Sequence, residues 1–356
     1  MNSGEKQSKK KGNSTLAIFA GCAVAFMVIT TIISVIFYRR NLSAVENLLS
    51  DREYQQYNSY VIFVAEDDNS NFWNEVYTAA KNRGAKEGVC VDRISDNLKG
   101  DFSKTQLLEM AINSGCDGIL LEGDDSEKTV NLIKEAVDNG IVVVTMRNDS
   151  VDSVRTSFVG TSNYNVSRLY AQKIIETIQG YVDSTHTKAD VLILNGKSRT
   201  SEETISMMTG IQEAIAQADA EIPTLNFLNA EIDTKDEFAV EEYVQKLFLS
   251  DDLPNLIVCL DDSSTSSVYQ AMIDYNQVGK VELLGFYQSD TILGGIEQGV
   301  IDGTVTIDTK SLGEISERAF REYHETGYVS DFFVVNNELV DINNVKEYRE
   351  EHSDEK

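Results

Sequence analysis

The chain lacks the residue spacings that most metal and redox sites need. Its four cysteines, at positions 22, 90, 116 and 259, form no CxxC pair and no paired Cys/His spacing. Neither a zinc site nor a disulfide framework is therefore indicated. The three histidines, at positions 186, 324 and 352, lie far apart in polar surroundings. We expect no metal and no cofactor.

Sequence motifs of catalysis and nucleotide binding are also missing. There is no GxSxG, P-loop or GxGxxG. The segment from Asp67 begins like a calcium loop, but Phe72 stands where that loop needs glycine and Thr78 where it needs glutamate. The neighbouring acids Asp261 and Asp262 suit glycoside hydrolysis only at a defined separation, which a sequence does not show. The sequence therefore favours a protein that is not an enzyme.

Basic residues are scarce. The chain has 31 Lys and Arg against 58 Asp and Glu, which gives a formal net charge of −27. A surface of this sign repels nucleic-acid phosphates, so the charge argues against a DNA or RNA partner.

Only one apolar run is long enough to cross a membrane. Residues 15–38 contain no charged side chain, and a helix of that length spans a hydrocarbon layer of ~30 Å. The lysines of residues 1–14 predict a cytoplasmic tail, a single-pass anchor in the cell membrane and an extracytoplasmic C-terminal domain. A cleaved secretion signal fits less well, because the run is long and lacks an evident cleavage site. Residues 19–22 resemble a lipobox, but cleavage there would leave an apolar tail.

Short segments of other character flank the rest of the chain. Residues 41–59 carry Leu42, Val45, Leu48 and Leu49 at helical spacing and predict a short helical stalk. Residues 346–356 are highly charged, which predicts a solvated tail.

From residue 60 the sequence alternates between buried strands and amphipathic helices. The first series of predicted strands covers residues 60–65, 89–94, 118–121 and 141–146, and a second covers 191–194, 225–228, 256–260 and 281–286. Repeated βαβ units produce parallel sheets with helices on both faces. We therefore predict an α/β protein with two doubly wound lobes.

Aromatic and acidic residues gather where the first predicted strand ends. Phe72 and Trp73, the latter the only tryptophan, follow Glu66 and Asn69 closely. Ligands of open parallel sheets bind beyond the carboxyl ends of the strands. Aromatic faces pack on the C–H faces of a sugar, while carboxylates and amides bind its hydroxyls. This end of the strand is therefore a candidate sugar-binding site.

Five segments together resemble the type I periplasmic (solute-binding) protein family, in its ribose-, galactose- and autoinducer-binding branch. They are Val61–Val64 with Asn71–Trp73, Gly115–Leu121, Gly140–Thr145, Leu284–Phe286 and Ile296–Val305. The resemblance implies two lobes that are joined by three chain crossings and close on a ligand. It implies an N-terminal lobe of residues 60–161 plus 309–331, and a C-terminal lobe of residues 162–308 plus 332–345.

The strand ends and the resemblance together give the expected ligand-binding residues. They are Glu66, Asn69, Ser70, Phe72, Trp73, Glu122, Arg147, Asn148, Met207, Asp261, Tyr287 and Asp308.

Two of these positions depart from the resemblance. Sugar binders of this branch usually have Asp-Arg and Asp where this chain has Arg147-Asn148 and Tyr287, and neither arginine nor tyrosine accepts hydroxyl hydrogen bonds as aspartate does. A simple pentose is therefore disfavoured. Arg147 suits a ligand carboxylate or phosphate, or else an ion pair with Glu66, Glu122 or Asp308.

Together with the apolar run of residues 15–38, the resemblance implies a membrane-tethered, extracytoplasmic solute-binding protein that captures a sugar-like molecule and delivers it to an ABC importer. The alternative is a ligand-sensing co-receptor for a membrane histidine kinase. A cytoplasmic repressor core, which shares the fold, would need a DNA-binding helix-turn-helix where this sequence has the apolar run.

Overall fold

The computed structural model describes residues 57–179, 188–196, 201–218, 220–232, 237–250 and 252–352. Residues 58–356 form one compact unit, separate from residues 1–57. The predicted cytoplasmic tail, the predicted transmembrane helix and residues 41–56 of the predicted stalk lie outside the described residues. Residues 58 and 59, the last two of the predicted stalk, belong to the compact unit, and the first strand begins at Ser59. Over the described ranges, no helix combines the length and the apolar character needed to span a bilayer.

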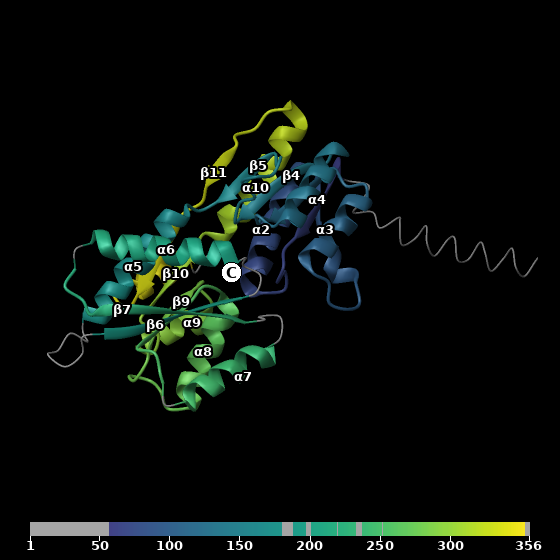
Figure 1. The fold of residues 1–356 in the computed structure, drawn as a ribbon. Coiled ribbons are helices and arrows are strands. Elements are labelled where there is room, and N and C mark those ends of the chain that lie inside the picture. Colours follow the sequence, from purple (N-terminus) through teal and green to yellow (C-terminus); the bar gives the residue numbers. More distant parts are fainter. Residues whose placement is uncertain are drawn as a thin grey trace, which may run out of the picture. The chain divides into compact units, whose positions relative to one another are not determined.

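Lobe 1 is built from residues 58–161 and 309–335 and contains a six-stranded sheet in the order β11-β5-β4-β3-β1-β2 (Figure 1). Every neighbouring pair in this sheet is parallel. Its elements are β1 (Ser59–Val64), α2 (Asn71–Glu87), β2 (Val89–Arg93), η2 (Ile94–Asn97), α3 (Lys104–Asn113), β3 (Gly118–Glu122), α4 (Glu127–Asp138), β4 (Val142–Arg147), β5 (Ser157–Gly160), α10 (Thr309–Thr326) and β11 (Phe332–Val334).

Lobe 2 is built from the described parts of residues 162–308 and 336–352 and repeats the design. Its sheet has the order β12-β10-β9-β8-β6-β7, in which only β12 runs antiparallel to its neighbour. Its elements are α5 (Asn163–Gln179), β6 (Lys188–Gly196), α6 (Ser201–Gln217), β7 (Thr224–Ile232), α7 (Glu237–Phe248), β8 (Leu256–Cys259), α8 (Asp262–Asp274), β9 (Glu282–Phe286), α9 (Asp290–Glu297), β10 (Gly303–Ile307), β12 (Asn337–Asp341) and α11 (Val345–Glu351).

The central strands are buried on both faces, as their continuous apolar runs predict. In lobe 1, α3 and α4 cover the face that carries Ile62 and Val143, while α2 and α10 cover the face that carries Phe63. In lobe 2, α5 and α6 pack on one face of the sheet, and α7, α8 and α9 on the other. The predicted α/β class with two parallel-sheet lobes is therefore confirmed.

The chain crosses between the lobes three times, at residues 161–162, at Asp308 and at residues 335–336. The third crossing differs from the expected one. The resemblance implies that Phe332–Val334 belongs to the C-terminal lobe, but this strand pairs with β5 in lobe 1. The Phe332 ring stacks on Phe158 at 5.2 Å between centroids, which helps to hold the strand there.

The predicted charged tail, residues 346–356, also differs over its described part, whereas residues 353–356 lie outside the described residues. Residues 345–351 form α11, and the side chains of Val345 and Tyr348 are buried in lobe 2. The charged residues lie on the exposed side of this short helix. The sequence alone therefore predicts a solvated tail, although the two apolar side chains are packed in lobe 2.

Candidate functional site

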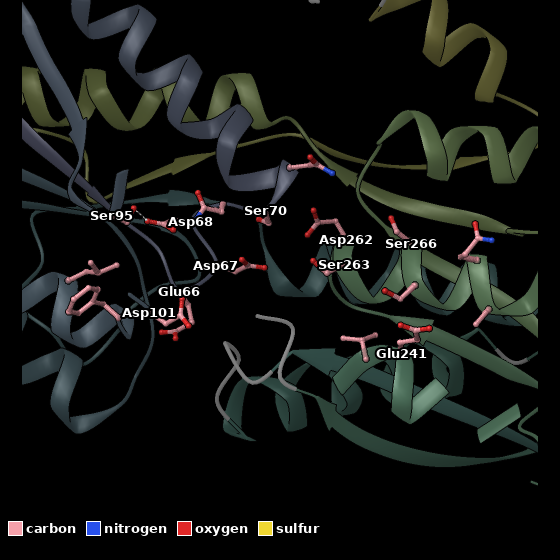
Figure 2. A pocket seen from close by; sticks show the side chains of 18 of the residues that line it. Glu66, Asp67, Asp68, Ser70, Ser95, Asp101, Glu241, Asp262, Ser263 and Ser266 are labelled. Carbon is pink, nitrogen blue, oxygen red and sulfur yellow. Dashed lines mark hydrogen bonds between the residues drawn. The ribbon is translucent and has the colours of Figure 1, made fainter. Parts of the chain in front are cut away.

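A cavity of about 950 Å³ lies between the two lobes (Figure 2). Loops that follow β1 and β2 border it on the lobe 1 side, and α7 and the length of α8 border it on the lobe 2 side. The polar residues that line it are Glu66, Asp67, Asp68, Asn69, Ser70, Asn71, Ser95, Asp101, Glu241, Asp262, Ser263, Ser266, Ser267, Gln270, Asp274 and Tyr275. Seven of these side chains are carboxylates and none is a cation.

Helix starts aim several of these groups at the cavity. Ser70 caps α2 by accepting a hydrogen bond from the backbone N–H of Trp73 at 3.4 Å. Asp261 caps α8 in the same way, accepting from the N–H of Ser264 at 2.7 Å. The next residue, Asp262, lies in the first helical turn and faces lobe 1 (Figure 2). Burial and the neighbouring Asp261 carboxylate raise the pKa of Asp262, and Arg147 partly offsets this.

A buried charge network fixes the lobe 1 wall. The Lys104 ammonium lies 2.6 Å from the Asp124 carboxylate, and both side chains are almost fully buried. The backbone N–H of Lys104 donates to the Glu66 carboxylate at 3.0 Å. The backbone N–H of Glu66 donates in turn to the Glu122 carboxylate at 2.9 Å. Glu66 therefore reaches the cavity from a position that two hydrogen bonds determine.

Close to the crossings, the lobes touch directly. The Phe72 ring of lobe 1 lies 5.6 Å from the Phe286 ring and 5.9 Å from the Tyr287 ring of lobe 2, measured between centroids. The Arg147 guanidinium carbon lies 4.9 Å from the Phe72 centroid and 4.8 Å from the Phe286 centroid. Its Nη2 donates across the lobes to the carbonyl oxygen of Leu260 at 3.3 Å.

Beside this contact lies a second, much smaller void of about 10 Å³. Its lining combines both lobes and includes Arg147, Asn148, Tyr170, Met207 and Phe286. A volume of this size holds about one water molecule. The inner part of the gap is therefore filled by the protein, and the open space lies in the acidic outer part.

Two residues at this contact have a strained backbone. Arg147 has a φ of 63° and Tyr287 a φ of 80°, in the left-handed region that side chains other than glycine and asparagine rarely adopt. They occupy equivalent places, since Arg147 is the last residue of β4, the fourth strand of lobe 1 along the chain, and Tyr287 directly follows β9, the fourth strand of lobe 2. Tyr287 is fully buried, and burial together with Glu75 of lobe 1 raises the pKa of its hydroxyl.

Of the expected ligand-binding residues, the structure brings eight to the gap between the lobes. Glu66, Asn69 and Ser70 line the large cavity, whereas Arg147, Asn148 and Met207 line the small void. Phe72 and Tyr287 form the contact between the lobes. Among the ion pairs weighed for Arg147, the guanidinium faces Glu122, at 4.0 Å.

The other four expected residues have structural positions and line neither cavity. Trp73 is 2% exposed and packs edge-on against Phe63 and Phe72 in the lobe 1 core. Its side chain extends from α2 toward the lobe 1 sheet rather than toward lobe 2. Glu122 is buried against the backbone of Glu66. Asp261 and Asp308 cap α8 and α10 with their carboxylates.

Sequence reasoning missed most of the lobe 2 wall. Glu241, Ser263, Ser266 and Asp274 lie on helices, several residues after the predicted strand ends. On α8, residues 263, 266, 270 and 274 follow one another at intervals of three or four, which places them on one helix face and was the available signal. Within the described residues, no group of three or more His, Cys, Asp or Glu side chains has the geometry to hold a metal ion.

Comparison with known proteins agrees with this architecture. The model of the periplasmic binding protein domain family matches residues 60–323, which is well over half of the chain. The chain therefore belongs to the periplasmic binding protein family.

Individual relatives are distant. The D-ribose/D-allose-binding protein of Pseudomonas aeruginosa is 24% identical over 222 residues, which cover 59% of this chain and 65% of that protein. The structure of an ABC transporter solute-binding protein from Burkholderia graminis, in complex with D-arabinose, superposes with a TM-score of 0.69 at 18% identity. It covers 82% of this chain and 98% of the other. A structure of the XylFII-LytSN complex contains a similar chain, with a TM-score of 0.66, 19% identity and coverage of 80% and 98%.

Proposed function

We propose that this protein is an extracytoplasmic solute-binding protein that captures a sugar-like small molecule between its two lobes. The observation that carries the proposal is the outer cavity, where polar groups of both lobes face one another across about 950 Å³. A ligand there contacts both lobes at the same time, so it stabilises the closed arrangement that a partner recognises.

The chemistry of the lining supports a polyhydroxylated ligand. Carboxylates accept hydrogen bonds from hydroxyl groups, while serine hydroxyls both donate and accept. The cavity presents both kinds of group from both lobes, for example Asp67 and Ser70 opposite Asp262 and Ser263 (Figure 2). Because the described residues that line this cavity include seven carboxylates and no cation, a neutral or cationic carbohydrate fits better there than an anionic one.

The protein is tethered to the membrane through residues 15–38, with its lobes outside the cell. The uncharged run and the lysines before it support this arrangement. Membrane fractionation of cells that produce the full chain, compared with a chain lacking residues 1–40, tests it. The full chain should stay in the membrane after a carbonate wash, and recovery of both in the soluble fraction would contradict the tether.

The closed form is presented to an ABC importer in the same membrane. The matched solute-binding proteins that are described as ABC transporter components support this partner. The second candidate is a co-receptor that passes the closed form to a membrane sensor kinase, and the XylFII-LytSN complex favours it, because there a similar chain has a protein partner. Permease genes next to this gene would support import, and a sensor kinase gene would support signalling.

A thermal-shift screen tests the ligand class. The full chain in detergent is heated with neutral sugars, amino sugars, sugar acids, sugar phosphates, amino acids and polyamines. A ligand present at a hundred times its Kd stabilises the folded state by about 2.7 kcal/mol, which raises Tm measurably. We expect a neutral or amino sugar to give the largest shift.

A matched pair of variants locates the binding. Asp262→Asn, in the cavity wall, should reduce the ligand-induced shift, whereas Asp138→Asn, on the exposed end of α4, should leave it unchanged. If amino acids or sugar phosphates raise Tm and no carbohydrate does, the proposal is wrong.

A further inference from the structure

Arg147 lies where the two lobes meet and contacts both of them. Its side chain starts at the end of β4 in lobe 1, packs against the Phe72 ring of the same lobe, and reaches the Phe286 ring and the Leu260 carbonyl of lobe 2. The side chain is 9% exposed. The guanidinium and the two rings together leave only the void of about 10 Å³ in this part of the gap.

The positive charge of Arg147 is complementary to the acidic residues around it. Four carboxylates of lobe 1 face three of lobe 2 across the outer cavity, and charges of like sign favour separation of the lobes. Among the described residues that line the two cavities, Arg147 is the only cation. Its guanidinium lies 4.0 Å from Glu122 of lobe 1 and is attracted to Asp262 of lobe 2. It therefore offsets repulsion between the acidic walls.

Two features of the Arg147 contact are energetically unfavourable, and the favourable cross-lobe contacts must outweigh them. The φ of 63° at Arg147 is a strained conformation for a residue that carries a side chain. The buried Nε of the same side chain has no hydrogen-bond partner in the described part of the structure. Such costs are sustained where surrounding contacts determine the position, and here those contacts come from both lobes.

We propose that Arg147 is an internal latch, which holds the lobes closed without a ligand and occupies the inner part of the gap. A ligand that enters the inner gap must displace the guanidinium, so Arg147 also restricts which ligands fit. This inference rests on the proposed function only in taking the gap between the lobes as the ligand site.

Lobe separation without any ligand tests the latch. Fluorescent dyes are attached to cysteines introduced by Asn139→Cys in lobe 1 and Gln245→Cys in lobe 2, both exposed positions. Cys22→Ser and Cys90→Ser limit labelling elsewhere, since Cys116 and Cys259 are buried. Single-molecule energy transfer is then recorded on the full chain in detergent, with no sugar present.

The latch predicts one dominant population of high transfer efficiency in the parent protein. Arg147→Ala should move most molecules to a lower efficiency, because the cross-lobe contacts are lost and the acidic walls repel. Arg147→Gly should do the same and suits the left-handed backbone, which provides a second variant if the alanine protein does not fold. Arg321→Ala is the control, because its ion-pair partner Glu317 lies in its own lobe, and it should match the parent.

A folded Arg147→Ala or Arg147→Gly protein with the parent's distribution would overturn the latch. So would a parent protein that is mostly open. Neither result depends on sugar binding, which the thermal-shift screen decides separately. If the latch exists, the two variants should also bind sugars that the parent excludes, since the inner gap is then vacant.

Discussion

Gly313 of α10 lies against Val76 of α2 so closely that a β-carbon on Gly313 would come 2.2 Å from the Val76 carbonyl oxygen. The two helices cover the same face of the lobe 1 sheet, and α10 enters lobe 1 only after the chain has completed most of lobe 2. This approach fixes the returning helix, and with it the second crossing, in place.

Gly313→Ala should therefore destabilise the protein by about 1–3 kcal/mol, because backbone atoms of α2 cannot move aside as a flexible side chain does. Chemical denaturation followed by circular dichroism measures the change. Gly294→Ala in α9 is the control, since its β-carbon would meet only the end of Arg349 at 3.9 Å. Alanine there should be neutral or stabilising. Equal effects of the two substitutions would contradict the close approach.

Trp73→Ala should destabilise lobe 1 by about 3–5 kcal/mol, as expected for loss of a buried aromatic side chain. The indole is 2% exposed and contacts Phe63 and Phe72. Trp73→Phe should cost clearly less, because a ring remains in the cluster. Unfolding curves and a sugar titration of Trp73→Phe separate the two roles. If Trp73→Ala were as stable as the parent protein but no longer bound sugar, Trp73 would be a ligand-binding residue rather than a core residue.

Lys104→Met should destabilise the protein by about 3–5 kcal/mol near neutral pH, because it leaves the buried carboxylate of Asp124 without its cationic partner and removes one of the positive charges near Glu122. Lys134→Met is the control, since Lys134 pairs with Asp138 on the exposed surface of α4, and its loss should change stability by less than about 1 kcal/mol.

The same pair gives a pH dependence. Burial by itself would raise the pKa of Asp124, but attraction and hydrogen bonding from Lys104 outweigh burial and lower it. An acid with a lowered folded pKa stabilises the protein above its unfolded pKa of about 3.9, and that stability is lost as the pH falls further. The difference between the parent and Lys104→Met should therefore shrink below about pH 4. A difference that is constant down to pH 2 would contradict the pairing.

Asp302→Asn should raise Tm at pH 8 and have little effect at pH 4. Burial and the nearby Glu282 raise the pKa of Asp302 to about 7. Between about pH 4 and pH 7 the unfolded chain ionises this carboxyl while the folded protein keeps it protonated, so stability falls as the pH rises through this window. Asparagine removes that loss and can still accept the hydrogen bond from the Leu283 N–H.

Thermal unfolding across this pH range measures the effect. The exposed Asp252 provides a control, and Asp252→Asn should leave the pH profile unchanged. A benefit of Asp302→Asn that is equally large at pH 4 and pH 8 would indicate a packing effect rather than titration.

Local patterns in the sequence were sufficient for the fold. Apolar runs such as Ile141–Met146 predict strands buried on both faces, and glycines such as Gly140 predict the helix ends between them, because both depend on neighbours in the chain. The expected place of the site, beyond the strand ends, follows from the parallel topology and coincides with the gap between the lobes.

Which side chains occupy that gap was decided by tertiary structure. Phe72 and Trp73 are adjacent on α2 and chemically similar, yet helical rotation turns one toward lobe 2 and the other into the lobe 1 core. Asp261 caps its helix while Asp262 faces the cavity. Arg147 meets Leu260, a residue 113 positions away, only because three crossings bring the lobes together. Periodicity sets the direction of a side chain within its own element, whereas the partner it meets depends on how distant elements pack.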